Sequence, residues 1–240
     1  MKIAILTDIH GNVEALDAVL RELDQQHIDQ IWSLGDMIAM GPDSNEVMAR
    51  LLDRGVQMIT GNHDEAVLSL LAGNGHPESY AHTRLHHEWV ARTLKPDYVD
   101  ALFRLSRVIE RTVNETRVTG IHYHIAPEKR DVSITEEPFH DIVEATLVNM
   151  QSLFGAYEAD VICFGHHHPV HQFQDEVRRY INPGALGVAR DDLARYGILE
   201  WKETGLDIQS KVVSYDKRSF LEKMERRNVP QRDVMFRLFY

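Results

Sequence analysis

Cysteine, basic residues and long apolar runs are all scarce in this chain of 240 residues. The single cysteine, Cys163, cannot form a disulfide within the chain, which favours a reducing compartment, so we expect a cytoplasmic protein. Asp and Glu number 37 against 26 Lys and Arg, and the net charge of −11 disfavours long nucleic acids and anionic membranes as partners. No stretch approaches the roughly 18 apolar residues that a membrane-spanning helix needs. We therefore expect a soluble protein.

Three short apolar segments near the N-terminus each end in polar side chains. Residues 3–6, 31–34 and 56–59 are expected to form strands, and apolar residues at helical spacing predict helices over 12–26 and 45–54. The three strands run into Asp8-Ile9-His10, Gly35-Asp36 and Gly61-Asn62-His63-Asp64. Open α/β sheets form their sites at the carboxyl ends of strands. The repetition therefore predicts an α/β protein with a functional site at this edge.

The rest of the chain is expected to mix helices with antiparallel strands, as in an α+β fold. The expected elements are a helical, irregular segment over 66–107, strands over 108–113, 116–121 and 161–164, a helix over 139–156, a strand meander over 171–213 and a helix over 219–227. The histidines from His76 to His87 are expected at the surface or in a lid. The apolar end, 234–240, should dock on the body or contact a partner, so a monomer or a homodimer is expected. No linker divides residues 1–240, which we expect to form one domain.

The strand ends together supply carboxylate, imidazole and amide side chains and no thiolate. They are Asp8, His10, Asp36, Asn62, His63, His122, His166 and His168. This set exceeds what one tetrahedral ion accepts, and its chemistry suits Mn²⁺, Fe²⁺ or Zn²⁺. Two ions roughly 3.5–4 Å apart, joined by one carboxylate, are the simpler account, and such a pair stabilises the attacking and leaving oxygens of a phosphoryl displacement. Asp36, from the central unit, is the candidate bridge.

Several positions leave two interpretations open. His122 and His124 both follow the strand over 116–121, and we favour His122 as the ligand because it ends the apolar run directly. Asn12 is expected to cap a helix and is also a candidate for contacting a substrate phosphate. Arg190 could neutralise substrate charge or be a plain surface residue.

These motifs, in this order, resemble the five sequence blocks of the calcineurin-like metallophosphoesterases. The blocks are Asp8-Ile9-His10, Gly35-Asp36 with Gly41-Pro42, Gly61-Asn62-His63-Asp64, the histidine near 122, and Gly165-His166-His167-His168. The turn Asn182-Pro183-Gly184 also resembles the compact bacterial phosphodiesterase-like branch. The resemblance covers residues 3 to about 190. It implies a four-layer αββα sandwich. The helical segment over residues 66–107 is long enough to form a small cap-like insertion in the single domain and to restrict the size of the substrate.

The resemblance also implies roles for the residues. One divalent metal, with manganese favoured and iron, zinc or nickel as alternatives, would be held by Asp8, His10, Asp36 and His168. The second would be held by Asp36, Asn62, His122 and His166. The nucleophile would be a metal-bridging hydroxide, and His63 would be the catalytic residue that stabilises charge or protonates the leaving oxygen.

One position departs from the phosphoprotein-phosphatase branch of this family. There an aspartate three residues after the bridging carboxylate orients the catalytic histidine, whereas this chain has Ala39. Protein-phosphatase activity is therefore disfavoured, and Asp64 or a backbone carbonyl is left to orient His63.

We accordingly expect a dinuclear metal-dependent phosphoesterase that hydrolyses phosphodiester or phosphoanhydride bonds of a small nucleotide-like substrate. Similar bacterial proteins imply a general phosphodiesterase or a diadenosine polyphosphate hydrolase. The alternatives are a phosphomonoesterase, a metal-storage or sensor protein, and a binding scaffold without turnover, like the retromer subunit that resembles this superfamily. The presence of His63 favours the enzyme, because a scaffold has no need of it.

Overall fold

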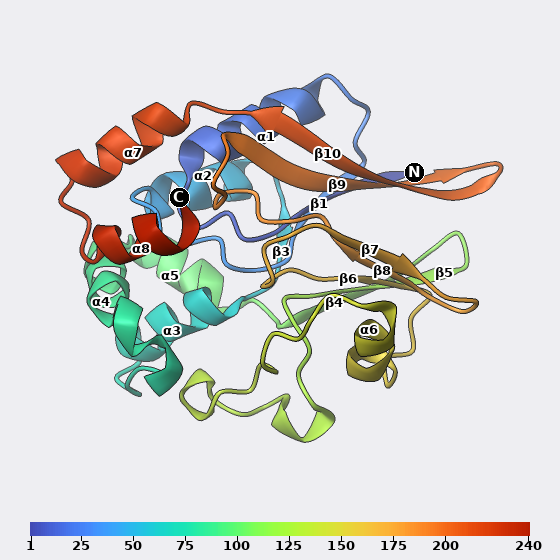
Figure 1. The fold of residues 1–240 in the computed structure, drawn as a ribbon, viewed down its shortest axis with the longest axis horizontal. Coiled ribbons are helices and arrows are strands. Elements are labelled where there is room, and N and C mark those ends of the chain that lie inside the picture. Colours follow the sequence, from blue (N-terminus) through green and yellow to red (C-terminus); the bar gives the residue numbers. More distant parts are fainter.

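Two five-stranded sheets pack face to face at the centre of the computed structural model, which describes residues 1–240 (Figure 1). The strands of the first sheet, in spatial order, are β10 (Gly205–Ser214), β9 (Leu193–Lys202), β1 (Lys2–Leu6), β2 (Gln30–Ser33) and β3 (Gln57–Met58). Those of the second are β4 (Val108–Val113), β5 (Thr116–Ile121), β6 (Val161–Cys163), β8 (Arg179–Asn182) and β7 (His171–Gln174). In each sheet three neighbouring strands run parallel: β1, β2 and β3 in the first, and β5, β6 and β8 in the second. The strands predicted near the N-terminus and over 108–121 are confirmed.

Alternation along the strands separates the protein into layers. Ile3 and Ile5 of β1 lie between the sheets in one cluster with Cys163 of β6, so the cysteine is a buried packing residue. Ala4 and Leu6 face the other way and pack with helix α1 (Val13–Asp24). Helices α1, α2 (Ser44–Asp53) and α7 (Lys217–Arg226) lie on the side of the first sheet, and α6 (Leu147–Phe154) covers the second together with the loop that contains η3 (Ile134–Glu136) (Figure 1). This arrangement confirms the four-layer αββα sandwich.

The predicted cap-like segment forms α3 (Asn62–Leu71), the 3-10 turn η1 (Glu78–Thr83), α4 (Arg84–Thr93) and α5 (Pro96–Phe103). These helices lie at one end of the sandwich (Figure 1). Val67, Val90 and Leu102 belong to the same hydrophobic cluster as α1 and α2. The segment is therefore packed into the main core, and α3 begins at Asn62, within the predicted site.

Two predicted elements were wrong. The helix expected over 139–156 is limited to α6, because the hydroxyl of Thr146 accepts the Asn149 N–H and caps the helix there, while Phe139 pairs with Ile125 in an isolated bridge. The strands expected as one meander are divided between the sheets. β7 and β8 pair in the second sheet and β9 and β10 in the first, since the loop after Asn182 crosses from one to the other.

The C-terminal residues dock on the body of the same chain. Helix α8 (Arg232–Phe239) buries Met235 completely, and the Tyr240 hydroxyl donates to the Gly187 carbonyl at 3.1 Å. Just before this helix, the Gln231 amide donates to the His82 carbonyl at 2.6 Å, and its oxygen accepts the His86 N–H at 3.1 Å. The C-terminus is thereby tied to the segment that contains α4.

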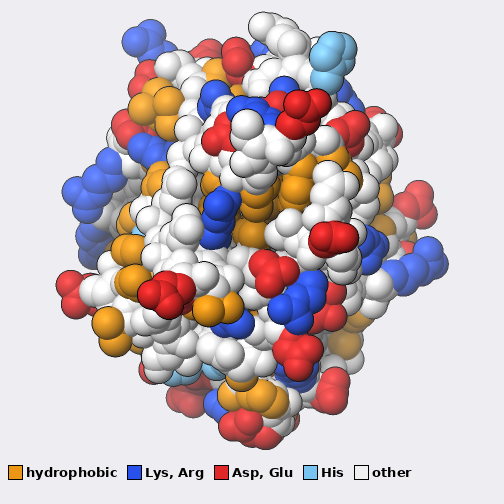
Figure 2. All heavy atoms as spheres, turned by 90° about the vertical axis from the view of Figure 1, so that its right-hand side faces the viewer, with side chains coloured by type: hydrophobic (Ala, Val, Ile, Leu, Met, Phe, Trp, Pro, Cys, Tyr) orange, Lys and Arg blue, Asp and Glu red, His pale blue; other side chains and the backbone are white.

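Figure 2 shows the end of the sandwich that lies opposite α3, α4 and α5. There, acidic and basic side chains are intermixed around hydrophobic side chains. No area of a single charge sign dominates that face. None of the helices combines the length and apolar character needed to cross a bilayer.

Leu199 on β9 tests the packing between the sheets, because it is fully buried there. Leu199→Ala is expected to lower the free energy of unfolding by about 2–5 kcal/mol through lost apolar contacts and the cavity left behind. Leu85→Ala on α4, where the leucine is 58% exposed, is the matched control and should cost under about 1 kcal/mol. Urea unfolding followed by circular dichroism measures both. Equal losses would contradict the packing described.

Candidate metal centre

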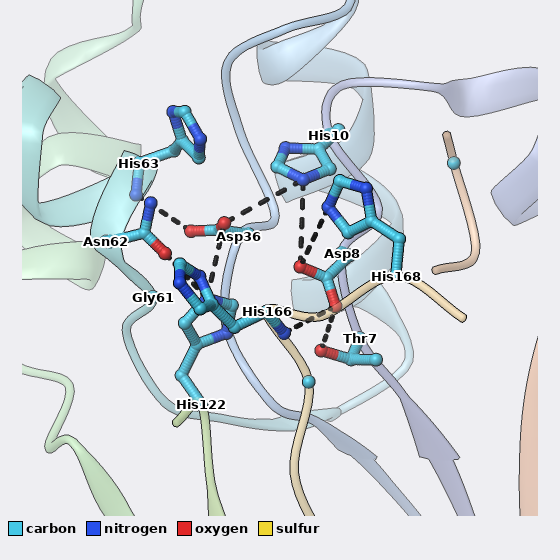
Figure 3. Close-up of polar contacts among 12 residues, drawn as sticks. Thr7, Asp8, His10, Asp36, Gly61, Asn62, His63, His122, His166 and His168 are labelled. Atoms are coloured by element: carbon cyan, nitrogen blue, oxygen red, sulfur yellow. Dashed lines mark hydrogen bonds and ion pairs between the residues drawn. The ribbon is translucent and has the colours of Figure 1, made fainter. Parts of the chain in front are cut away.

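Loops from both sheets bring the predicted ligands together at one end of the sandwich (Figure 3). Strand β1 leads to Asp8 and His10, β2 to Asp36, and β3 to Asn62 at the start of α3. From the second sheet, β5 leads to His122, and β6 leads to His166 and His168. Two groups of side chains each place their ligand atoms within 4.8 Å of one another: Asp8, His10 and His168, and Asp36, His122 and His166.

The first group is built around Asp8. One oxygen of its carboxylate, Oδ2, accepts hydrogen bonds from the Thr7 hydroxyl at 2.8 Å and the His166 N–H at 3.0 Å. The other, Oδ1, is buried without a hydrogen-bond partner and lies 3.7 Å from His10 Nε2 and 3.6 Å from His168 Nε2. One carboxylate oxygen is thus anchored, and the other is free to bind a cation.

Asp36 lies between the two groups (Figure 3). Its Oδ1 accepts the backbone N–H of His63 at 2.8 Å, in the first turn of α3. Its Oδ2 is 3.7 Å from His10 Nε2 on one side and 3.3 Å from His122 Nε2 on the other. Burial raises the pKa of Asp36, but the adjacent imidazoles of His122 and His63 outweigh burial and hold that pKa well below its usual range. This charged carboxylate has the position expected of a bridging ligand.

The backbone sets the ring orientation of His122. Its Nδ1 is 2.7 Å from the Leu34 carbonyl, which can only accept a hydrogen bond, so Nδ1 carries a proton. Nε2 then faces Asn62 Oδ1 at 2.8 Å and Asp36 Oδ2. Burial lowers the pKa of His122, but the charge and hydrogen bond of Asp36 outweigh burial and raise the pKa to about 9. Acceptor atoms converge here, and either a proton on Nε2 or a cation satisfies them.

His124, the alternative to His122, lies elsewhere. It is half-buried, with its ring against those of His140 and Tyr157, and it belongs to neither ligand group. The geometry therefore favours His122 as the ligand.

The residues fit two divalent ions. Asp8 Oδ1, both ring nitrogens of His10 and the Asn62 Nδ2 are buried without hydrogen-bond partners. Each such atom costs about 1–3 kcal/mol when it is left unsatisfied, and bound cations would satisfy the acceptors among them. Burial lowers the pKa of His10 to about 4 and that of His166 to about 3, so both are neutral and present lone pairs near neutral pH. Oxygen and imidazole donors together suit Mn²⁺, Fe²⁺ and Zn²⁺.

The ligand loops are held in strained backbone conformations. Asp8, His10, Asp36 and His166 have φ angles of +52°, +51°, +51° and +66°, in the left-handed region that residues other than glycine seldom adopt. A Cβ at Gly165 would collide with the Thr7 hydroxyl, and one at Gly61 would collide with the Asp36 carboxylate. Glycine is required at these two positions because the loops approach so closely. Strain concentrated in this way is typical of functional sites.

His63 borders a cavity of about 350 Å³ that opens beside the two ligand groups. The cavity also contacts Asp36, Asn62, His166 and His168, so these ligands are reachable from it. Its apolar wall includes residues that the sequence analysis did not assign to the site: Tyr80, Ile142, Leu238 and Phe239. Of these, only Leu238 and Phe239 gave a signal, as part of the unusually apolar C-terminus.

The prediction that Asp64 or a carbonyl orients His63 was wrong. Both oxygens of Asp64 accept backbone N–H groups, Oδ1 from Met37 and Ile38 and Oδ2 from Gly61, so this carboxylate organises the ligand loops. Burial, with Asp36 nearby, raises its pKa to about 7. The ring nitrogen Nδ1 of His63 instead lies 2.9 Å from Nε2 of His87. The prediction of a surface position was also wrong for His87, because both His87 and the preceding His86 on α4 are fully buried.

Neither predicted substrate-binding residue borders the cavity. Asn12 is fully buried, where its Oδ1 accepts the Ala15 N–H and caps α1 and its Nδ2 donates to the Gly187 carbonyl. Arg190 is exposed on the loop before β9. The structure therefore gives Asn12 an architectural role and leaves Arg190 at the surface.

The fold and the two ligand groups together are those of the metallophosphoesterase fold class. The chain belongs to the calcineurin-like phosphoesterase superfamily, whose domain model matches residues 1–204. Among individual proteins, an uncharacterized protein of Methanocaldococcus jannaschii is 28% identical over 95% of this chain and 94% of its own length. The symmetrical bis(5'-nucleosyl)-tetraphosphatase of Erwinia tasmaniensis is 30% identical over 53% of this chain, and the match spans only 46% of that enzyme.

Solved structures share the whole fold. A metallophosphoesterase from Sphaerobacter thermophilus matches with a TM-score of 0.72 and 24% identity, covering 96% of each chain. A hypothetical protein from Pyrococcus horikoshii matches with a TM-score of 0.79 and 16% identity, covering 100% of this chain and 98% of the other. At these identities the likeness establishes the architecture.

Removing the charge of Asp36 tests the metal centre. Asp36→Asn keeps the shape but removes the charge between the two ligand groups, so we expect affinity for Mn²⁺ to fall by roughly 100-fold or more and the metal content to drop. Asp53→Asn, at the exposed end of α2, is the matched control. Metal analysis after dialysis and calorimetric titration measure both quantities. Unchanged binding by Asp36→Asn would rule out the bridging position.

Proposed function

We propose that this protein is a hydrolase that uses two divalent ions to cleave phosphodiester or phosphoanhydride bonds in a small nucleotide-like substrate. The observation that carries the proposal is the position of Asp36 Oδ2 between His10 of one ligand group and His122 of its own group, beside a cavity. When bound, such ions would activate water and neutralise charge on the phosphoryl oxygens. Manganese is the favoured metal, with iron, zinc or nickel as alternatives. The single buried thiol fits a reducing compartment such as the cytoplasm.

The protein's own groups divide the remaining tasks. Asp8 and Asp36 supply the negative charge that holds cations, and the imidazoles would complete the ligand set, since each binds a cation through an uncharged nitrogen lone pair. His63 borders the cavity and belongs to neither ligand group. Its ring centroid lies 5.3 Å from that of His10. Burial lowers the pKa of His63 to about 3, so the ring is neutral. From this place it would face a phosphoryl group and stabilise charge on the leaving oxygen by donating a hydrogen bond.

The cavity favours a substrate with an aromatic portion. A volume of about 350 Å³ is at the lower end of the range for small-molecule sites. Tyr80 and Phe239 contribute aromatic rings to its wall, and Ile142 and Leu238 add aliphatic surface. A nucleobase can stack on such a wall while its phosphates lie at the metal ligands. The name of the Erwinia relative, a tetraphosphatase of dinucleosides, supports this substrate class.

His63→Gln tests the catalytic proposal in protein that has been stripped by a chelator and reloaded with Mn²⁺. We expect metal-dependent hydrolysis of bis-p-nitrophenyl phosphate by the wild type, and a fall in kcat of roughly 10²–10⁴-fold in the variant with no loss of metal. His27→Gln, at an exposed position, is the matched control and should retain full activity.

The same assay separates the rival functions. Preference for p-nitrophenyl phosphate over the diester would establish a phosphomonoesterase. Binding of metal without turnover of either compound, or of dinucleoside polyphosphates, would overturn the enzyme proposal in favour of a scaffold or metal-binding protein.

Phe239→Ala tests the nucleotide-binding wall. Loss of one stacking surface, worth about 0.5–1.5 kcal/mol, should raise KM for a dinucleoside polyphosphate several-fold and leave inhibition by inorganic tripolyphosphate, which has no base, unchanged. Phe103→Ala, at an exposed position on α5, is the matched control. Steady-state kinetics provide both constants. An equal weakening of both ligands would show that Phe239 does not select for the base.

A further inference from the structure

Three histidines from three different segments form a continuous chain that ends at the proposed catalytic residue. His63 Nδ1, on α3, is 2.9 Å from His87 Nε2 on α4. His87 Nδ1 is in turn 2.7 Å from Nε2 of His76, in the loop between α3 and η1. His63 and His87 are buried, whereas His76 is half-buried. The chain therefore leads from the cavity toward the surface.

Hydrogen bonding couples the proton positions of the three rings. Each contact between two ring nitrogens needs one N–H and one lone pair. Burial lowers the pKa of His87 well below its ordinary value, so this ring is neutral and has a single N–H. If that N–H is at Nε2, it donates to His63 and the Nδ1 atom must accept from His76. If it is at Nδ1, both hydrogen bonds reverse. The N–H groups of the three histidines therefore all point in the same direction, either toward the cavity or toward the surface.

The side chains that could otherwise orient His63 are absent or occupied. Position 39 is an alanine, and the two oxygens of Asp64 accept three backbone N–H groups. His87 is the side chain that contacts His63 Nδ1 at hydrogen-bond distance. A neutral partner also suits this place, because it adds no further negative charge beside the buried Asp36.

We propose that His87 is the positioning residue for His63, and that His76 holds His87 in the tautomer that donates toward the cavity. His63 then accepts at Nδ1 and carries its own proton on Nε2, the nitrogen left to approach a leaving oxygen. The inference rests on the proposed hydrolysis and deepens it, since an imidazole takes the orienting role. His87 acts through His63 and does not itself touch the substrate.

The kinetic test compares two diesters, bis-p-nitrophenyl phosphate and diphenyl phosphate. Loss of an oriented hydrogen-bond donor matters most for the phenoxide that develops more negative charge, so His87→Phe should lower kcat roughly 100-fold for diphenyl phosphate and under about tenfold for the nitrophenyl ester, with metal content unchanged. His87→Gln keeps a polar atom near the position of Nε2 and should restore part of the loss. A fall by the same factor for both esters would overturn the positioning role.

His86→Gln is the matched control on the same helix. His86 is also fully buried, and its ring nitrogens have no hydrogen-bond partners. The substitution therefore perturbs packing without removing a hydrogen bond between His63, His87 and His76. We expect it to leave the ratio of the two kcat values unchanged.

Nuclear magnetic resonance of protein labelled with ¹⁵N-histidine tests the chain without relying on activity. Besides the protected Nδ1–H signal of His122, which donates to the Leu34 carbonyl, two protected imidazole N–H signals are expected, one for each contact between the three histidines. These two should vanish in His87→Phe and persist in His86→Gln, whereas the His122 signal should persist in both variants. The absence of these two signals from the wild type would overturn the inference. If the signals are present but the protein hydrolyses no phosphoester, the hydrogen bonds between the three histidines stand and the proposed function is refuted.

Discussion

Two carboxylates are buried in one site, and much of the structure serves to accommodate them. Asp8 and Asp36 are almost completely removed from solvent, and such burial costs several kcal/mol for each charge unless partners compensate. The backbone N–H of His166 donates a hydrogen bond to Asp8, and the backbone N–H of His63 donates one to Asp36. The second of these comes from the first turn of α3, where the helix dipole favours a negative charge. The remaining oxygens, Asp8 Oδ1 and Asp36 Oδ2, face imidazole nitrogens, and the negative charge that is not yet compensated there makes the site suited to binding cations.

Neither sheet could build this site alone. The first sheet contributes both carboxylates and the Asn62 amide, and the second contributes His122, His166 and His168. The distance between the carboxylates and these imidazoles is therefore set by the packing of apolar side chains between the sheets. The contact of Gly165 with Thr7 shows how little freedom remains, because even one added carbon would collide. Stability and ligand geometry in this protein thus depend on the same core.

Segments far from the ligands in the sequence decide what can reach them. Tyr80 of η1 and Phe239 of α8 border the same cavity, and Gln231 ties the two segments together through His82 and His86. Helix α8 lies beyond residues 1–204, the part of the chain that the family model matches. The ligands therefore belong to the shared domain, while part of the wall that a substrate would meet comes from the C-terminal extension.

The strand ends were predictable because they are local. A short apolar run followed by Asp8 and His10 or by His166 and His168 carries its own signal, and neighbouring parallel strands end at one edge whatever the rest of the chain does. The same reasoning identified Asp36 as the central carboxylate. Prediction from local patterns failed where the result depends on which strand pairs with which. Strand patterns did not show that β7 and β8 join one sheet and β9 and β10 the other.

Adjacent residues in the chain were thus enough to predict the candidate ligands, their order along the sequence and the class of fold. Tertiary packing was needed to show that Asp64 serves the ligand loops, that His87 contacts His63 and that Phe239 faces the cavity. His63 and His87 are 24 residues apart on different helices, and their contact follows from how α3 and α4 pack. Such packing is settled by the burial of apolar surface over the whole molecule, which no local pattern encodes.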